Sequence, residues 1–292
     1  MQALMLETML LLTINHQSLI ATKANRIVRA ANGRPVMEFG ARRAHGYGAA
    51  YYGARAAIIG GCAGTSCLLT AKDFGVAASG TMAHSWVQLF DDEYTAFKTY
   101  AEKYPDSCML LVDTYNVLKS GIPNAIKVFD DVLKPLGKRP LGIRIDSGDI
   151  TYITKKARKM LDAAGFPDAI ICASGDLDEK LIASLKSQGA KIDLWGVGTK
   201  LITSSDLPAL GGVYKLAALY PAEGGEINKI KLSDNSDTTT NPDFTEVFRI
   251  YDNEIRNAAA DLICLKGEEI DERDPLTIFH PKDTWKRTTF TN

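Results

Sequence analysis

The stretch Leu141-Gly-Ile-Arg-Ile-Asp-Ser-Gly-Asp149 decides the fold of this chain. Residues 141–146 form a mostly apolar run of strand length, and polar, glycine-rich residues follow it directly. Apolar runs of this length are typical of strands that are buried on both faces, as in a parallel sheet. The stretch therefore predicts a buried strand whose C-terminal end carries a polar loop.

The same pattern recurs along the chain. Predicted strands cover residues 36–39, 76–79, 109–113, 141–146, 169–173, 194–197 and 213–217, and predicted helices cover 91–103, 121–136, 151–165 and 178–189. Alternation of this kind implies an α/β fold, either an irregular (β/α) barrel or an open doubly wound sheet. Polar clusters follow nearly every strand, which favours the barrel, because barrel active sites lie at that rim.

The chain divides into three predicted parts. Residues 1–34 form an amphipathic helix to about Ala31, ended by an Asn-Gly-Arg-Pro stop signal. Residues 35–220 form the catalytic barrel, and 221–292 part of a smaller β-containing domain with strands at 227–232 and 247–251. Because an apolar helix starts at Met1, we expect an upstream part to be absent.

Composition excludes several classes of protein. The chain has 292 residues, 46% hydrophobic, with 34 basic and 35 acidic residues and net charge -1. This balance predicts neither a nucleic-acid nor a membrane partner. The apolar stretch 4–14 contains Glu7 and lacks a basic leader, so it predicts no signal peptide or membrane span. Five cysteines without metal-ligand spacing predict reduced thiols, no zinc site and a cytoplasmic protein.

The turn Gly80-Thr-Met-Ala-His-Ser85 presents a histidine directly after the predicted strand 76–79. The glycine permits a tight turn, the hydroxyls can donate hydrogen bonds, and an imidazole can accept a proton or a phosphoryl group. A structural histidine in a loop is the alternative interpretation.

Arg144 and Asp146 lie two residues apart on one predicted strand, so their side chains point to the same face. If that face lines the barrel, Asp146 can hold ribose hydroxyls or magnesium, and Arg144 can pair with a carboxylate or phosphate. A buried ion pair is the alternative.

Three further loops have the chemistry of anion sites. Ser174-Gly175-Asp176 and Gly196–Thr199 follow successive strands and offer backbone N–H groups and hydroxyls to a phosphate. Arg42 and Arg43 follow Phe39, which suits an anionic, planar ligand that stacks as well as pairs. Ordinary turns and a solvated arginine pair are the alternatives.

Together these motifs resemble the nicotinate phosphoribosyltransferase family. The resemblance rests on Glu38-Phe39-Gly40 with Arg42-Arg43-Ala44, Gly64-Thr65-Ser66, Gly80 to Ser85, Arg144 to Asp149, Ser174 to Glu179, Trp195 to Thr199 and Pro208 to Leu216. It covers nearly the whole chain, in order. It implies the type II phosphoribosyltransferase barrel and the ATP-coupled synthesis of nicotinate mononucleotide and pyrophosphate, as part of NAD salvage.

The resemblance also implies roles for individual residues. His84 matches a histidine that ATP phosphorylates transiently. Thr81 and Arg144 match contacts to nicotinate, and Phe39 and Arg42 match the region that stacks on the base and pairs with its charge. Asp146 matches the carboxylate that binds ribose, and Thr199 matches a sugar-phosphate contact. The phosphates are expected among Ser147, Gly148, Ser174, Gly175 and Gly198, and the catalytic set is His84, Arg144, Asp146 and Arg42.

The implied partners are nicotinate, phosphoribosyl pyrophosphate, Mg²⁺ and ATP, in a homodimer. A neutral Ser66, where a nicotinamide-specific relative carries aspartate, favours the acid over the amide. Cys67 replaces the family's usual Asn, and the family's amino-terminal domain and end segment have no counterpart here, so we expect a chain truncated at both ends.

A nicotinamide-specific relative remains an alternative, and two others are open at this point. One is a non-catalytic fragment or pseudoenzyme that keeps the phosphate-binding barrel. The other is a different barrel enzyme, such as an aldolase, for which Lys215 is the only contender as Schiff-base lysine.

Overall fold

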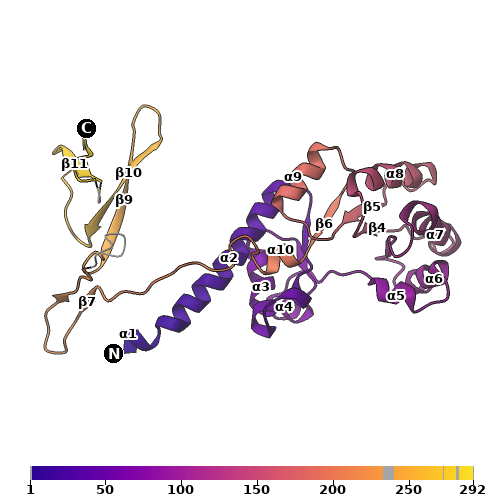
Figure 1. Cartoon of the computed structure of the whole chain (residues 1–292), viewed down its shortest axis with the longest axis horizontal. Helices are drawn as coiled ribbons and strands as arrows, with labels where there is room; N and C mark the ends of the chain where they lie inside the picture. The colour runs from indigo at the N-terminus through magenta and orange to yellow at the C-terminus, as the bar shows by residue number, and fades with distance from the viewer. Residues whose placement is uncertain (1, 233–239, 272, 281–282, 292) are drawn as a thin grey trace. The chain divides into compact units, whose positions relative to one another are not determined.

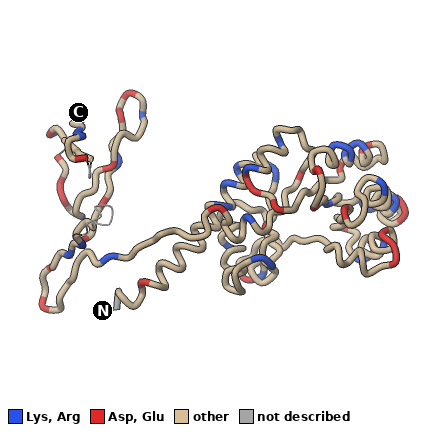
Figure 2. The backbone as a smooth tube through the Cα atoms, viewed as in Figure 1, with Lys and Arg blue, Asp and Glu red and all other residues tan. Residues whose placement is uncertain are grey.

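The computed structural model describes residues 2–232, 240–271, 273–280 and 283–291. The chain divides between Gly212 and Val213 into two compact units, coloured along the sequence in Figure 1. Basic and acidic residues are distributed along the backbone of both units (Figure 2), as the near-zero net charge predicts. In the described part of the chain, no helix combines the length and the apolar character that crossing a membrane requires.

The first unit is built on a six-stranded parallel sheet. Its strands are β1 (Val36–Glu38), β2 (Gly64–Thr65), β3 (Met109–Leu111), β4 (Gly142–Ile145), β5 (Ile170–Ala173) and β6 (Leu194–Val197). They lie in the order β2-β1-β6-β5-β4-β3. The first strand therefore pairs with both the second and the last, as happens when a sequential series of strands curls into a ring.

An irregular segment between β2 and β3 pairs with the edge of β2 and reaches the residues that follow β3. Ala78 forms an isolated parallel bridge with Thr65 of β2, and His84 lies 3.1 Å from Thr114, just beyond β3. The predicted irregular barrel is thus confirmed over the open doubly wound sheet. The predicted strand 76–79 is wrong apart from that bridge, because the segment has a strand neighbour on one side only and Ala77 is exposed.

Helices surround this sheet in two groups, α5 to α8 near one end and α2, α3, α4 and α9 near the other (Figure 1). Their bounds are α1 Gln2–Met5, α2 Glu7–Ala31, α3 Tyr47–Ile59, α4 Leu68–Phe74, α5 His84–Gln88, α6 Glu93–Lys103, α7 Ile122–Val128, α8 Ile150–Ala163, α9 Glu179–Ser187 and α10 Thr199–Ile202. A 3₁₀ turn, η1, covers Ala41–Arg43, and two π-helical turns, η2 (Val117–Gly121) and η3 (Phe129–Leu133), flank α7.

Helix ends follow their sequence signals. The Asp149 carboxylate accepts from the Tyr152 N–H at 3.0 Å and so caps the helix that follows it, α8. The predicted stop after the first long helix is confirmed as well, since Asn32 and Gly33 adopt left-handed φ values of 51° and 85°. The predicted single helix 121–136 is wrong in detail, because α7 ends at Val128 and continues as the π-helical turn η3, while η2 overlaps the predicted range only at Gly121.

Two apolar cores hold the unit together. One packs α6, α7 and α8 on β3 and β4, and includes Phe97, Leu110, Phe129, Ile143 and Leu161. The other packs α2 and α9 on β1 and β6, and includes Ile20, Ile27, Val36, Ile182 and Trp195. The two cores leave the C-terminal ends of the strands free to carry polar side chains.

Among its described residues, the second unit contains three antiparallel strand pairs. They are β7 (Ala218–Leu219) with β8 (Ile227–Asn228), β9 (Thr245–Tyr251) with β10 (Ala258–Leu265), and β11 (Leu276–Phe279) with β12 (Arg287–Phe290). The predicted strand 247–251 lies within β9, and the predicted strand 227–232 shortens to β8.

The predicted barrel strand 213–217 is wrong. Its residues are extended but join no ladder, they belong to the second unit, and Val213 is 70% exposed. An apolar run forms a strand only where a neighbour can accept its hydrogen bonds. The sequence also misses β2, α3, α4, α5 and α10; among these, β2 and α10 are only 2 and 4 residues long.

Candidate active site

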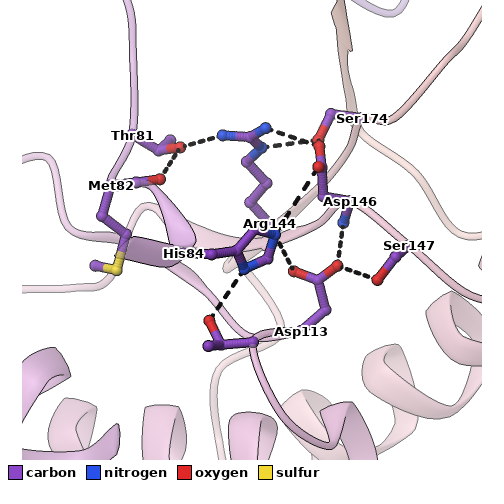
Figure 3. Close-up of polar contacts among 9 residues, drawn as sticks. Thr81, Met82, His84, Asp113, Arg144, Asp146, Ser147 and Ser174 are labelled. Carbon is purple, nitrogen blue, oxygen red and sulfur yellow. Dashed lines mark hydrogen bonds and ion pairs between the residues drawn. The ribbon is translucent and has the colours of Figure 1, made fainter. Parts of the chain in front are cut away.

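Arg144 lies at the centre of a polar cluster at the barrel rim (Figure 3). Its Nε donates to Ser174 Oγ, its Nη1 to Thr81 Oγ1 and its Nη2 to Asp146 Oδ1, each at 2.8 Å. Its guanidinium carbon lies 5.4 Å from the centre of the Phe39 ring, within cation–π range. One side chain from β4 therefore connects the rim residues of β1, β5 and the loop before α5.

Asp146 faces the same side as Arg144, as strand alternation predicts. The two form the ion pair that the sequence analysis gave as its alternative, with side chains 14% and 26% exposed. Ser174 donates a second hydrogen bond to the same oxygen, Oδ1. Burial by itself raises the pKa of Asp146, but the Ser174 hydrogen bond and the Arg144 charge outweigh it, so this pKa lies below its usual value.

His84 is the first residue of α5 and reaches into the same cluster (Figure 3). Its Nδ1 lies 3.1 Å from Thr114 Oγ1. Its Nε2 lies 3.8 Å from Asp113 Oδ1 and 3.9 Å from Asp146 Oδ2. The ring is 40% exposed, so one nitrogen is held by the protein while the other faces two carboxylates at an accessible edge.

Asp113 is a site residue that the sequence analysis did not select. Its side chain is 1% exposed, and its Oδ2 accepts from the Asp146 N–H at 3.0 Å and from Ser147 Oγ at 2.5 Å. Its Oδ1 is buried without a hydrogen-bond partner in the described structure and faces His84. The available signal was its position two residues beyond the end of a buried strand, β3.

His84, Arg144 and Asp146 line one cavity of about 470 Å³. Its lining includes Phe39, Arg42, Ser66, Thr81, Met82, His84, Leu111, Arg144 and Asp146. The cavity thus brings together the imidazole, both guanidinium groups and the carboxylate that the sequence analysis predicts to converge. An aromatic ring and apolar Leu111 beside cations suit a flat, anionic ligand.

A second cavity of about 220 Å³ adjoins the first and shares Phe39, Arg42, Arg144 and Asp146 with it. It adds Arg43, Ser174, Gly175, Asp176, Gly196, Gly198 and Thr199. Gly175 has a φ of 93°, and a Cβ there would lie 2.1 Å from the Asp146 carbonyl oxygen. Only glycine fits that turn, which leaves its backbone open toward the cavity.

Two predicted phosphate contacts lie elsewhere in the described structure. Ser147 and Gly148 line neither of these cavities but a third one, of about 440 Å³, which shares Asp146, Ser174 and Gly175 with the second. Ser147 donates to Asp113, so its hydroxyl is engaged inside the cluster.

Fold and rim define the class of protein: an α/β barrel whose strand ends form a cavity lined by two arginines beside a carboxylate-flanked histidine. Residues 35–254 match the model of the nicotinate phosphoribosyltransferase (NAPRTase) family, and residues 244–292 match the nicotinate phosphoribosyltransferase C-terminal domain. The chain belongs to the nicotinate phosphoribosyltransferase family.

Individual relatives agree. The chain is 50% identical over its whole length to nicotinate phosphoribosyltransferase of Bacillus subtilis, covering 59% of that protein. It is 47% identical to nicotinate phosphoribosyltransferase pncB2 of Mycobacterium tuberculosis over 76% of the chain and 47% of that protein. The crystal structure of human nicotinic acid phosphoribosyltransferase matches 98% of the chain and 63% of that protein, with a TM-score of 0.79 and 25% identity. The chain thus spans less than two thirds of these relatives.

Proposed function

We propose that this chain carries the catalytic barrel of a nicotinate phosphoribosyltransferase, which joins nicotinate to the ribosyl phosphate of phosphoribosyl pyrophosphate and releases pyrophosphate. The observation that carries the proposal is the convergence of Thr81, His84, Arg144 and Asp146 on one cavity of a chain from this family. The cavity offers an aromatic face and cations to nicotinate, and the adjoining cavity offers glycine-rich backbone and hydroxyls to phosphate.

In the transfer step, the nicotinate ring nitrogen attacks C1 of the ribose and forms the new C–N bond. The bond from C1 to the pyrophosphate oxygen breaks, and its electron pair leaves with that oxygen. Positive charge develops on the sugar, so the Asp146 carboxylate stabilises the sugar, and the Arg42 and Arg144 guanidiniums stabilise the two anionic reactants. Ser66 offers a neutral hydroxyl, which suits a carboxylate better than an acidic side chain does.

ATP acts through His84 in this proposal. If Nδ1–H donates to Thr114, the lone pair of Nε2 is free to attack the terminal phosphate of ATP, forming the N–P bond as ADP leaves. The phosphorylated ring is cationic at its nitrogens before hydrolysis, and Asp113 and Asp146 stabilise that charge. The buried, unpartnered Asp113 Oδ1 is well placed for this role.

Magnesium would arrive with the phosphates. The described residues contain no group of three His, Cys, Asp or Glu side chains that forms a dedicated metal site. Mg²⁺ commonly binds one or two carboxylates together with substrate phosphates and water. Asp113 and Asp146 fit that need. Each has a carboxylate oxygen that faces His84 and accepts no side-chain hydrogen bond. When bound, the ion neutralises phosphate charge.

The test is labelling with ATP carrying ³²P in its terminal phosphate. We expect acid-labile label on the wild type and on His280→Ala, and none on His84→Ala, together with nucleotide product from nicotinate. Label without product favours the non-catalytic fragment, and product from nicotinamide instead favours the amide-specific relative. If the wild type gives no label and no product, the proposal is wrong. The homodimer and the cytoplasmic location implied by the resemblance belong to the same proposal.

A further inference from the structure

Glu38 is a buried carboxylate that the proposed chemistry does not use. It is the last residue of β1 and is 0% exposed, and no described Lys, Arg or His forms an ion pair with it. Its Oε1 accepts from the Gly40 N–H, and its Oε2 accepts from Thr65 Oγ1 at 2.6 Å. Both oxygens therefore face donors, and the two donors belong to different strand ends, those of β1 and β2.

Gly40 and Thr65 are sequence neighbours of two residues that line the first cavity, the one of about 470 Å³, which is the larger cavity below. Gly40 follows Phe39, and Thr65 precedes Ser66; Phe39 and Ser66 line the cavity, whereas Glu38 does not. Thr65 Oγ1 also accepts from the Cys67 N–H at 2.9 Å, and the Ser66 N–H donates to the Glu38 carbonyl at 2.9 Å. The Ser66 N–H is therefore hydrogen-bonded to Glu38 itself, and the neighbouring Cys67 N–H is hydrogen-bonded to Thr65, the side-chain partner of Glu38.

Burying a carboxylate without a cation is costly, and burial raises the pKa of Glu38 despite the two hydrogen bonds. An apolar side chain would fill the same space, but it would leave the Gly40 N–H and the Thr65 hydroxyl without this acceptor. The carboxylate is therefore suited to holding two segments in one relative position rather than to packing.

We propose that Glu38 is a positioning residue for the pyridine ring: its carboxylate ties the Phe39 segment to the Ser66 segment and so fixes the base side of the cavity. This role rests on the proposed nicotinate transfer. The second cavity also has Phe39 in its lining, but it depends on Glu38 less, because Ser174, Gly175 and Thr199 follow β5 and β6.

Glu93 provides a matched control. It is also a buried carboxylate, 5% exposed, and it accepts from Ser120 Oγ at 2.8 Å and from Asn124 Nδ2 at 3.0 Å. None of these three residues lines the larger cavity or the second one. A generic effect of neutralising a buried glutamate therefore appears equally in Glu93→Gln and Glu38→Gln.

The first measurement is steady-state kinetics of the two glutamine variants. In Glu38→Gln an amide NH₂ replaces one acceptor and faces a donor, so we expect KM for nicotinate to rise about tenfold. KM for phosphoribosyl pyrophosphate and kcat should stay within about threefold of the wild type, and Glu93→Gln should change neither KM. A Glu38→Gln variant that shifts both KM values equally, or that behaves like Glu93→Gln, overturns the proposal.

The second measurement does not depend on catalysis. Amide hydrogen exchange at Gly40 and Cys67 should quicken at least about tenfold in Glu38→Gln and stay unchanged in Glu93→Gln. If exchange at these amides is unchanged in Glu38→Gln, the proposed link between the Phe39 and Ser66 segments is wrong. Should Glu38→Gln fail to fold, Thr65→Val keeps the carboxylate, breaks the same link from the β2 side, and must give the same nicotinate-specific rise in KM. A failed proposed function shows separately, as absence of nucleotide product from the wild type.

Discussion

Replacing Arg144 by methionine tests how much the rim cluster contributes to stability. The change removes three donated hydrogen bonds of 2.8 Å and leaves Asp146 without its counter-charge. Breaking a buried ion pair costs about 3–5 kcal/mol, and the 26% exposure of Asp146 favours the lower end. We therefore expect the free energy of unfolding to fall by about 3 kcal/mol, which for a unit of this size lowers Tm by about 6–12 °C.

Urea and thermal unfolding followed by circular dichroism measure this loss. Adding Asp146→Asn to Arg144→Met removes the stranded charge and should restore about 1–2 kcal/mol, a non-additivity typical of residues in contact. Arg139→Met is the control, because its pair with Asp168 is 51% exposed on both sides, so its loss should cost much less than the loss of Arg144.

The pH dependence has a definite sign. Because the pKa of Asp146 is lowered in the folded protein, its contribution is present above the unfolded value, near about 4, and is lost as the pH falls through the folded value. The difference between wild type and Arg144→Met should therefore shrink in acid. The reasoning is refuted if Arg144→Met lowers the free energy of unfolding no more than Arg139→Met does. It is also refuted if the loss in the double variant equals the sum of the losses from Arg144→Met and Asp146→Asn alone.

Two further changes probe the frame of the site. Lys23 is buried between Glu179 at 2.8 Å and Asp206 at 2.7 Å. Lys23→Met should therefore lower the free energy of unfolding by about 2 kcal/mol, measured by chemical unfolding, whereas Lys72→Met, at an exposed position, should leave it almost unchanged. Equal losses in the two variants would contradict the role of this ion network. A Cβ at Gly196 would lie 2.6 Å from two carbons of the Phe39 ring. Gly196→Ala should therefore destabilise the fold by about 1–3 kcal/mol and raise KM for nicotinate. An unchanged KM would show that the position of the ring does not depend on Gly196.

Local signals predicted much of this fold. Apolar periodicity, capping aspartates and glycine stops predicted strand 194–197, the end of α2, and the starts and ends of α6, α8 and α9, because these signals act within a few residues of one another. The pattern failed where tertiary contacts overrode it. The apolar run 213–217 found no strand to pair with, and the predicted helix 121–136 contains the π-helical turn η3, which no local signal announces.

The candidate site divides in the same way. The pairing of Arg144 with Asp146 was predictable, because residues two apart on a strand share a face. The meeting of His84 with Asp113, and of Glu38 with Thr65, was not, since those partners are 29 and 27 positions apart and meet only when β1, β2 and β3 take their places in the ring.

The sequence by itself determined which residue types end each strand, and hence that cations, carboxylates, hydroxyls and one histidine would gather at the barrel rim. Only the tertiary structure decided which of them touch. Contacts between strand ends depend on the order of strands around the sheet and on side-chain packing across it, and neither is encoded within a short stretch of chain.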